Sequence, residues 1–238
     1  MKFVNYAHRG ASEYFPENTM RSFYAGLEMG ADGIETDIQR TLDGVLVLYH
    51  DDTLRRIVMD DRNLCQCTYQ ELLKMDFGRW MGEAYAGERI VTLDTFLNHF
   101  GRRDIHLALE LKQIGIEQDC LECVNKYECR ENVTFTSFHW ESLLALRKID
   151  SVIDIGFLTD RITEEIIRQL KQADIGQICP RIDLVNESDM ALARANGLFV
   201  RFWGVRNEQD MWRALALQGD GTTCNFPDKL AAVLRTHV

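Results

Sequence analysis

The feature that most limits how this chain can fold is the alternation of short apolar runs with helix-like segments along almost all of its 238 residues. The runs have the length and composition of β-strands, and apolar residues in the longer segments recur at three- and four-residue spacing, which is typical of helices. The expected strands are 3–7, 33–38, 45–49, 105–111, 133–137, 153–158, 175–180, 198–203 and a weaker one at 222–225. The expected helices are 17–29, 93–100, 116–129, 140–149, 163–173, 187–196, 208–217 and 227–236. Such alternation implies a parallel sheet.

The number of strand–helix units decides between two parallel architectures. A chain of this length filled with such units fits a closed (β/α)8 TIM barrel, which typically needs about 250 residues. An open doubly wound sheet is the alternative, but the glycine-rich phosphate loops GxGxxG and GxxxxGK[ST] do not occur. Residues 51–89 interrupt the alternation with Asp, Arg and Gly and only short helical patches. The sequence therefore predicts one α/β TIM barrel domain over residues 1–238, with a small insertion at about 51–89 after the second strand.

Charge and cysteine content exclude several classes of protein. With 37 acidic and 27 basic residues the formal net charge is −10. Neither nucleic acid nor an anionic membrane is therefore expected as the main partner, since both need a cationic surface. No apolar run approaches the roughly 18 residues of a transmembrane helix, and residues 1–8 do not resemble a signal peptide. Seven cysteines, an odd number, argue against a secreted disulfide framework, so we expect a cytoplasmic protein with reduced thiols.

Charged and titratable residues gather at the predicted C-terminal ends of the first strands. In a TIM barrel these ends surround the active site. They hold His8 and Arg9, Glu35 and Asp37, His50, and Glu110 and Lys112. Glu35 and Asp37 are two residues apart on one strand, so their side chains lie on the same face. We therefore expect these residues to meet in one site.

Three of these residues are candidate metal ligands. Two carboxylates on one face repel each other unless a cation lies between them, and hard divalent ions take carboxylate oxygens. Glu35, Asp37 and Glu110 could supply three ligands to Ca²⁺ or Mg²⁺, and Mn²⁺ is a further candidate ion. A lone Glu-x-Asp pair would sooner be solvated or salt-bridged, but the third acid and the nearby histidines favour a metal site.

The remaining residues suit the chemistry of a phosphate. His8 and His50 could serve as general acid and base, because imidazole titrates near neutral pH. Arg9 offers a guanidinium fork and Lys112 a point charge, and both can bind phosphate oxygens. Alternatively, both cations balance the three acids, and the two roles are compatible.

The order and spacing of these residues resemble those of one enzyme family. The motifs are His8-Arg9-Gly10-Ala11, Pro16-Glu17-Asn18-Thr19, Gly33-Ile34-Glu35-Thr36-Asp37, His50-Asp51, Glu110-Leu111-Lys112 and the segment from Phe202 to Asn207. Together they are similar to the motifs of the glycerophosphodiester phosphodiesterase family, and the resemblance spans the barrel. It implies a TIM barrel that is a phosphoric diester hydrolase, cleaving a glycerophosphodiester to an alcohol and glycerol 3-phosphate.

The resemblance also implies a role for each candidate residue. The implied metal ligands are Glu35, Asp37 and Glu110, the acid and base are His8 and His50, and the substrate-binding residues are Arg9, Lys112 and Trp203. One divalent cation, Ca²⁺ or Mg²⁺, is the implied cofactor, and a small glycerophosphodiester is the implied partner. The resemblance leaves open which histidine is the acid and which the base.

Two other functions stay open. The same residues could cleave another phosphodiester, or a lysophospholipid in the manner of a lysophospholipase D. A long-chain substrate would need an apolar surface, for which the insertion offers Phe77, Trp80, Met81 and Tyr85. These side chains could equally form the insertion's own core, because aromatic residues are usually inside. A non-catalytic binding barrel is the other alternative, and it would be expected to lack acids or histidines that this chain retains.

One segment departs from the family pattern. Members commonly carry a Thr-Asp pair before the last helix, where this chain has Cys224-Asn225. The missing acid puts in question a supporting role at the closing strand of the barrel, and not the three metal ligands.

Overall fold

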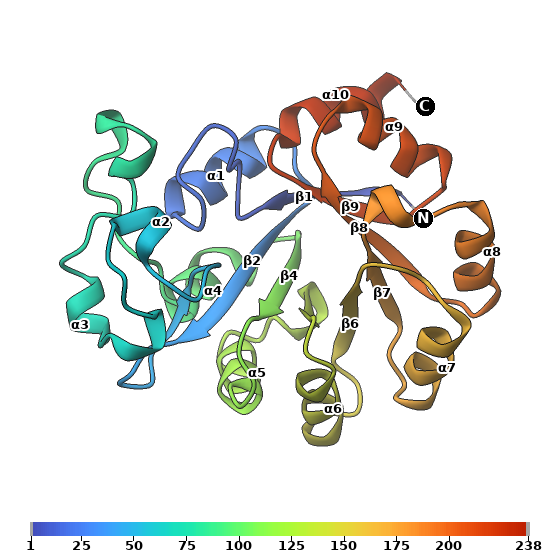
Figure 1. Ribbon diagram of the computed structural model, residues 1–238, viewed down its shortest axis with the longest axis horizontal. Helices are drawn as coiled ribbons and strands as arrows, with labels where there is room; N and C mark the ends of the chain where they lie inside the picture. The colour runs from blue at the N-terminus through green and yellow to red at the C-terminus, as the bar shows by residue number, and fades with distance from the viewer. Residues whose placement is uncertain (1, 237–238) are drawn as a thin grey trace.

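The computed structural model describes residues 2–236, and within them parallel strands close into a TIM barrel (Figure 1). The strand order is β1-β9-β8-β7-β6-β5-β4-β2-β3, and pairing of β1 with β2 closes the ring. Only β3 runs antiparallel among the described strands, as a hairpin on the outer end of β2. The strands are β1 (Val4–His8), β2 (Gly33–Arg40), β3 (Leu46–Leu48), β4 (His106–Leu111), β5 (Val133–Ser137), β6 (Asp154–Thr159), β7 (Gln177–Pro180), β8 (Phe199–Val205) and β9 (Gly221–Cys224).

The long helices surround the barrel and separate successive strands (Figure 1). They are α1 (Met20–Glu28), α4 (Leu93–Phe100), α5 (Glu117–Lys126), α6 (Trp140–Ile149), α7 (Glu164–Gln172), α8 (Glu187–Ala195), α9 (Glu208–Ala216) and α10 (Pro227–Thr236). Several begin after a side chain that accepts a hydrogen bond from the first turn, as Thr19, Thr92 and Thr163 do. Such caps satisfy backbone N–H groups that the helix itself leaves unpaired. The expected TIM barrel is confirmed.

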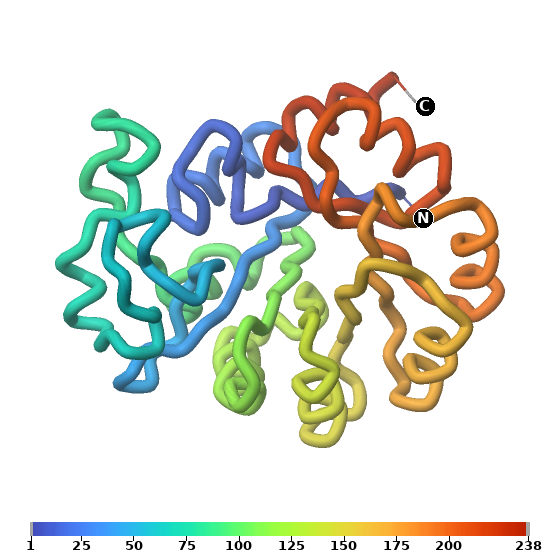
Figure 2. The backbone as a smooth tube through the Cα atoms, viewed as in Figure 1, coloured from blue at the N-terminus to red at the C-terminus, as the bar shows by residue number. Residues whose placement is uncertain are grey.

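A segment without long helices lies between β3 and α4 and extends to one side of the barrel (Figure 2). It contains α2 (Arg55–Val58), η1 (Leu64–Gln66), α3 (Tyr69–Leu72), η2 (Arg79–Met81) and η3 (Glu83–Tyr85). Leu54, Leu64, Leu72 and Phe77 are buried together there in a cluster separate from the main core. We call residues 51–89 the insertion. Its bounds, and the organisation of residues 1–238 as one domain, stay predictions.

The interior of the barrel is polar where most TIM barrels are aliphatic. The usual filling is layers of Val, Ile and Leu, and the apolar side chains here pack mainly between strands and helices. Inside the barrel, Glu35, Thr136 and Arg201 are at most 3% exposed. At the C-terminal ends of β1, β2 and β4, the barrel interior therefore holds charged side chains instead of the usual aliphatic layers.

Candidate active site

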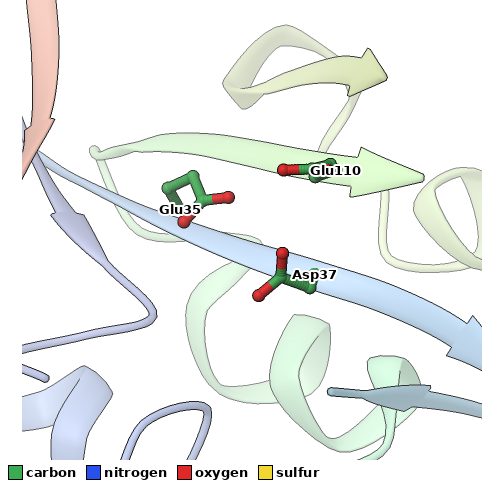
Figure 3. Close-up of side chains that lie close together, drawn as sticks. All are labelled: Glu35, Asp37 and Glu110. Carbon is green, nitrogen blue, oxygen red and sulfur yellow. The ribbon is translucent and has the colours of Figure 1, made fainter. Parts of the chain in front are cut away.

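Glu35, Asp37 and Glu110 form a buried cluster of carboxylates at one end of the barrel (Figure 3). The first two lie on β2 and the third on β4, and strand register places Asp37 beside Glu110. One ligand atom from each residue lies within 4.8 Å of the others. Figure 3 shows the three side chains directed toward one another.

This cluster fits a hard divalent cation. Glu35 Oε2 and Asp37 Oδ1 are buried without a hydrogen-bond partner, and such orphaned atoms are costly unless something binds them. Burial, with the charges of Asp37 and Glu110, raises the pKa of Glu35 to about 8. Burial and the charge of Asp37 also raise the pKa of Glu110. The oxygen donors that Ca²⁺ and Mg²⁺ prefer are carboxylates. Three of them lie close together here, and two have raised pKa values, so the donor set fits such an ion.

Two cationic side chains form ion pairs with the same acids. Arg9 Nε lies 3.1 Å from Asp37 Oδ2, and Lys112 Nζ lies 2.9 Å from Glu110 Oε1. Burial alone would raise the pKa of Asp37, but the charges of Arg9, His50 and Lys112 hold it at about 2. Asn18 also donates from Nδ2 to Asp37 Oδ2 at 3.1 Å, so the Pro16-Glu17-Asn18-Thr19 turn supports the acid cluster directly.

The two histidines follow different strands, His8 at the end of β1 and His50 just after β3, but both line the same cavity. His8 Nδ1 lies 2.6 Å from Asn225 Oδ1, and its Nε2 lies 3.8 Å from Glu35 Oε2. Burial, with the charge of Arg9, lowers the pKa of His8 to about 4. His50 Nδ1 lies 2.6 Å from Asp51 Oδ1. In each ring the Nδ1 edge is engaged by the protein, which leaves Nε2 for other partners.

The cavity at this end of the barrel has a volume of about 320 Å³, within the range of small-molecule sites. Its charged end, as we call it, lies at the ends of β1 to β4 and holds His8, Arg9, Glu35, His50, Glu110 and Lys112. Its apolar end lies at the ends of β5, β6 and β8 and holds Phe138, Leu158, Trp203 and Val205, with Arg201 and Arg206 also in the lining. The indole of Trp203 is fixed, because Nε1 donates to the Thr159 carbonyl at 3.0 Å. Phe138 meets it edge-on at a centroid distance of 5.5 Å. The cavity can thus hold a phosphate at one end and an organic group at the other.

The structure brings together the residues predicted as metal ligands, acid and base, and substrate-binding groups. All of them line the cavity except Asp37, which contacts the lining residue Arg9. Asn225, which the sequence placed only at the closing strand, contacts His8 directly. The sequence did not predict Phe138 and Leu158, because charged residues marked only the ends of the first strands. These two apolar residues lie at the ends of β5 and β6. The sequence did not predict Arg201 either, because a charged residue inside a strand carries no motif, although this side chain lines the cavity at 2% exposure.

No helix within residues 2–236 is long and apolar enough to cross a membrane. The insertion contributes none of its described aromatic side chains to the cavity wall, since Phe77 is buried in the separate cluster and Trp80 lies outside the lining.

Comparison with known proteins gives one consistent family. Residues 8–229 match the sequence profile of the Glycerophosphoryl diester phosphodiesterase family. The chain is 32% identical over 240 residues to a glycerophosphodiester phosphodiesterase from Caldanaerobacter subterraneus, with 99% of each chain covered. It is 29% identical over 250 residues to a glycerophosphodiester phosphodiesterase from Bacillus subtilis, covering 95% of this chain and 85% of that one.

Solved structures share the fold. A phosphodiesterase from Oleispira antarctica, in complex with the product sn-glycerol-3-phosphate, superimposes with a TM-score of 0.87 at 24% identity, covering 98% of this chain and 96% of that one. A glycerophosphodiester phosphodiesterase from Thermotoga maritima gives a TM-score of 0.81 at 22% identity, covering 98% and 99%. At these identities the likeness concerns the barrel itself.

Proposed function

This chain belongs to the glycerophosphoryl diester phosphodiesterase family and is a phosphoric diester hydrolase, and on that premise we propose that it cleaves glycerophosphodiesters to an alcohol and glycerol 3-phosphate with the help of one divalent cation. The observation that carries the proposal is one cavity at which a buried three-carboxylate cluster meets two histidines and the cationic side chains of Arg9 and Lys112. Each part suits one requirement of phosphodiester hydrolysis.

Glu35, Asp37 and Glu110 would hold the cation, with Ca²⁺ and Mg²⁺ the leading candidates and Mn²⁺ a third. Bound there, such an ion would supply positive charge against phosphoryl oxygens. The register of two adjacent strands, which sets Asp37 beside Glu110, supports this assignment.

The two histidines would move the protons. One of His8 and His50 takes a proton from the attacking group, and the other protonates the departing alkoxide. Attack by water gives glycerol 3-phosphate directly, whereas attack by a neighbouring hydroxyl of the substrate gives a cyclic phosphodiester that water must then open. Their anchored Nδ1 edges support this role, because Asn225 and Asp51 fix each ring and free the Nε2 edge. The order of the two roles is left open.

Arg9 and Lys112 would bind the phosphoryl group. Both lie at the charged end of the cavity and stand beside the acids. As charge builds on phosphorus in the transition state, fixed cations in a dry site stabilise it more strongly than water does. Trp203 would pack against the glycerol or the leaving group at the apolar end.

A small diester suits this cavity better than a lysophospholipid. An acyl chain needs a long apolar surface next to the catalytic groups, and the insertion adds nothing to the apolar wall formed by Phe138, Leu158, Trp203 and Val205. Phe77 packs into the insertion's own core. A purely binding role is disfavoured because the full set of acids and histidines is retained.

The deciding experiment is a panel of glycerophosphodiesters assayed with and without chelator, restoring Ca²⁺, Mg²⁺ or Mn²⁺ one at a time. We expect release of glycerol 3-phosphate that stops with chelator and returns with at least one ion. Glycerophosphocholine and its acylated form are compared in the same panel, and the small diester should turn over faster. Failure to hydrolyse any diester with any ion would overturn the proposal.

A further inference from the structure

Arg56, on the short helix α2 of the insertion, connects two parts of the active site that are far apart in the chain. Its Nε lies 2.6 Å from Asp51 Oδ2, and its NH2 lies 3.1 Å from Asp51 Oδ1. On the other side, NH1 donates to Glu17 Oε2 and NH2 to Glu17 Oε1, both at 2.8 Å. One guanidinium thus makes two-point contacts with two carboxylates.

Both carboxylates lead directly to residues of the proposed mechanism. Asp51 Oδ1 lies 2.6 Å from His50 Nδ1. Glu17 Oε1 accepts from Arg9 NH1 at 3.0 Å, and Arg9 Nε reaches Asp37 at 3.1 Å. An unbroken series of charge-assisted contacts therefore runs from a proton-transfer histidine, through Arg56, to the phosphate-binding arginine and the acid cluster.

We propose that Arg56 is a positioning residue, which sets the separation and orientation of His50 and Arg9 by holding Asp51 and Glu17 at once. The inference rests on the proposed function, because it assigns Arg56 a task only if His50 and Arg9 act on the substrate. Arg56 itself does not line the cavity, so it acts through its two acids.

The chemistry of the side chain explains why an arginine is needed here. A planar guanidinium presents its donors in a fixed fork, and each edge can bind a carboxylate at two points. Without a cation between them, Asp51 and Glu17 would repel each other and turn toward solvent. Lysine supplies the charge but not the fork, so it can neutralise the acids without fixing their planes.

The surroundings of Arg56 favour a rigid fork. Glu17 is only 12% exposed and Asp51 24%, so each acid has little freedom once its partner is in place. Trp80, which also belongs to the insertion, lies over the guanidinium with a centroid distance of 5.8 Å. The insertion therefore affects the catalytic residues through the contacts of Arg56 with Asp51 and Glu17, and not by forming the cavity wall.

Steady-state kinetics on Arg56→Ala, Arg56→Gln and Arg56→Lys, with a substrate that the wild-type protein hydrolyses, tests the proposal. Misplacement of a catalytic group by about 1 Å can cost about a hundredfold in rate. We expect kcat to fall by about 10- to 100-fold in all three variants, with KM changed much less. Added guanidinium ion at millimolar concentration should restore part of kcat to Arg56→Ala, while ammonium at the same concentration should not.

Arg55→Ala is the matched control. Arg55 precedes Arg56 on the same helix, is 77% exposed, and pairs with Asp61 at 3.1 Å outside the series. We expect wild-type kinetics from this variant. Kinetics are measured at a temperature at which both variants are folded, and melting temperatures with and without Ca²⁺ verify this, which separates positioning from folding.

Two results would overturn the positioning role. One is a kcat for Arg56→Ala within twofold of that for Arg55→Ala. The other is a kcat loss that accompanies a lower melting temperature and resists guanidinium rescue, because that is the behaviour of a structural residue. If the wild-type protein and Arg55→Ala hydrolyse no diester, the proposed function fails and the positioning role with it. An Arg56→Ala variant with wild-type kcat, in contrast, removes the positioning role alone.

Discussion

At the scale of single residues, the two histidines differ in the group that contacts the Nδ1 atom of the ring. His8 faces the neutral amide of Asn225, whereas His50 faces the carboxylate of Asp51. The amide oxygen accepts a hydrogen, so it fixes the tautomer of His8 with the proton on Nδ1 and the lone pair on Nε2. An amide can therefore orient His8 while adding no charge beside the acid cluster.

Replacing the histidines one at a time tests their part in proton transfer. We expect His8→Ala and His50→Ala each to lower kcat by about 10²- to 10⁴-fold, the usual scale for a lost general acid or base. Initial rates of glycerol 3-phosphate release measure the loss. His99→Ala is the control, because His99 contacts Tyr24 on the outer helices and lies outside the cavity. Full activity in both cavity variants would contradict the assignment.

Replacing Asn225 tests the orienting contact. Asn225→Ala removes the acceptor of His8 Nδ1 and frees the ring to adopt either tautomer, so we expect kcat to fall about tenfold, within the scale of a lost hydrogen bond of about 1 to 1.5 kcal/mol. Asn225→Asp retains an acceptor and should keep most of the activity. Equal activity in the alanine and aspartate variants would show that the contact does not orient His8.

The residues predicted from the sequence and those missed differ in how far away their partners are. Glu35 and Asp37 could be paired from their spacing alone, because two residues along a strand is one face. Asn225 lies 217 positions from His8, and Arg56 lies 39 positions from Glu17. Only barrel closure and the course of the insertion bring those partners together, and neither is encoded in a local pattern.

At the scale of elements, the regular part of the barrel followed closely from hydrophobic periodicity. Helices α4, α6 and α10 have the bounds expected from the sequence, and even the weak last strand is present as Gly221–Cys224. β2 ends at Arg40 rather than at residue 38, because its last residues pair with β3. The insertion could be recognised only as an interruption, since its helices are too short to repeat a period.

The insertion's core gives a prediction at this scale. Leu72 is fully buried in the cluster of Leu54, Leu64 and Phe77. Replacing it by alanine should lower the free energy of unfolding by about 2 to 4 kcal/mol, the usual range for a buried leucine. Urea denaturation followed by tryptophan fluorescence measures the loss. Met59 is 89% exposed, so Met59→Ala should unfold at the wild-type urea concentration. A Leu72→Ala variant as stable as Met59→Ala would contradict the idea that this segment has a core of its own.

At the scale of the whole molecule, a net charge of −10 coexists with a cavity able to receive an anion. The barrel collects three of its acids into a cluster that fits a cation and surrounds them with Arg9, Lys112 and the buried Arg201. Overall charge bears on which partners the outer surface can attract. It could not predict the sign of the cavity, which depends on which few charges the fold turns inward.

The same cluster leads us to expect that the stability of the whole protein depends on pH and on a bound cation together. The folded-state pKa of Glu35 is raised to about 8, above its ordinary value of about 4.3. Between these values the folded protein without metal binds more protons than the unfolded chain, so its stability falls as pH rises through 8. A bound cation needs the carboxylates ionised and removes this penalty.

We therefore expect Ca²⁺ or Mg²⁺ to raise the melting temperature more at pH 8.5 than at pH 6. An ion at about 100 times its dissociation constant adds about 2.7 kcal/mol, which corresponds to about 5 to 10 °C for a chain of this size. Differential scanning calorimetry at both pH values, with and without chelator, measures the two shifts. Glu35→Gln is the control, because the glutamine has no proton to release. This variant should lose both the rise in melting temperature on adding the ion and the pH dependence of that rise. An equal shift at the two pH values in the wild-type protein would mean that Glu35 is not the group that binding deprotonates.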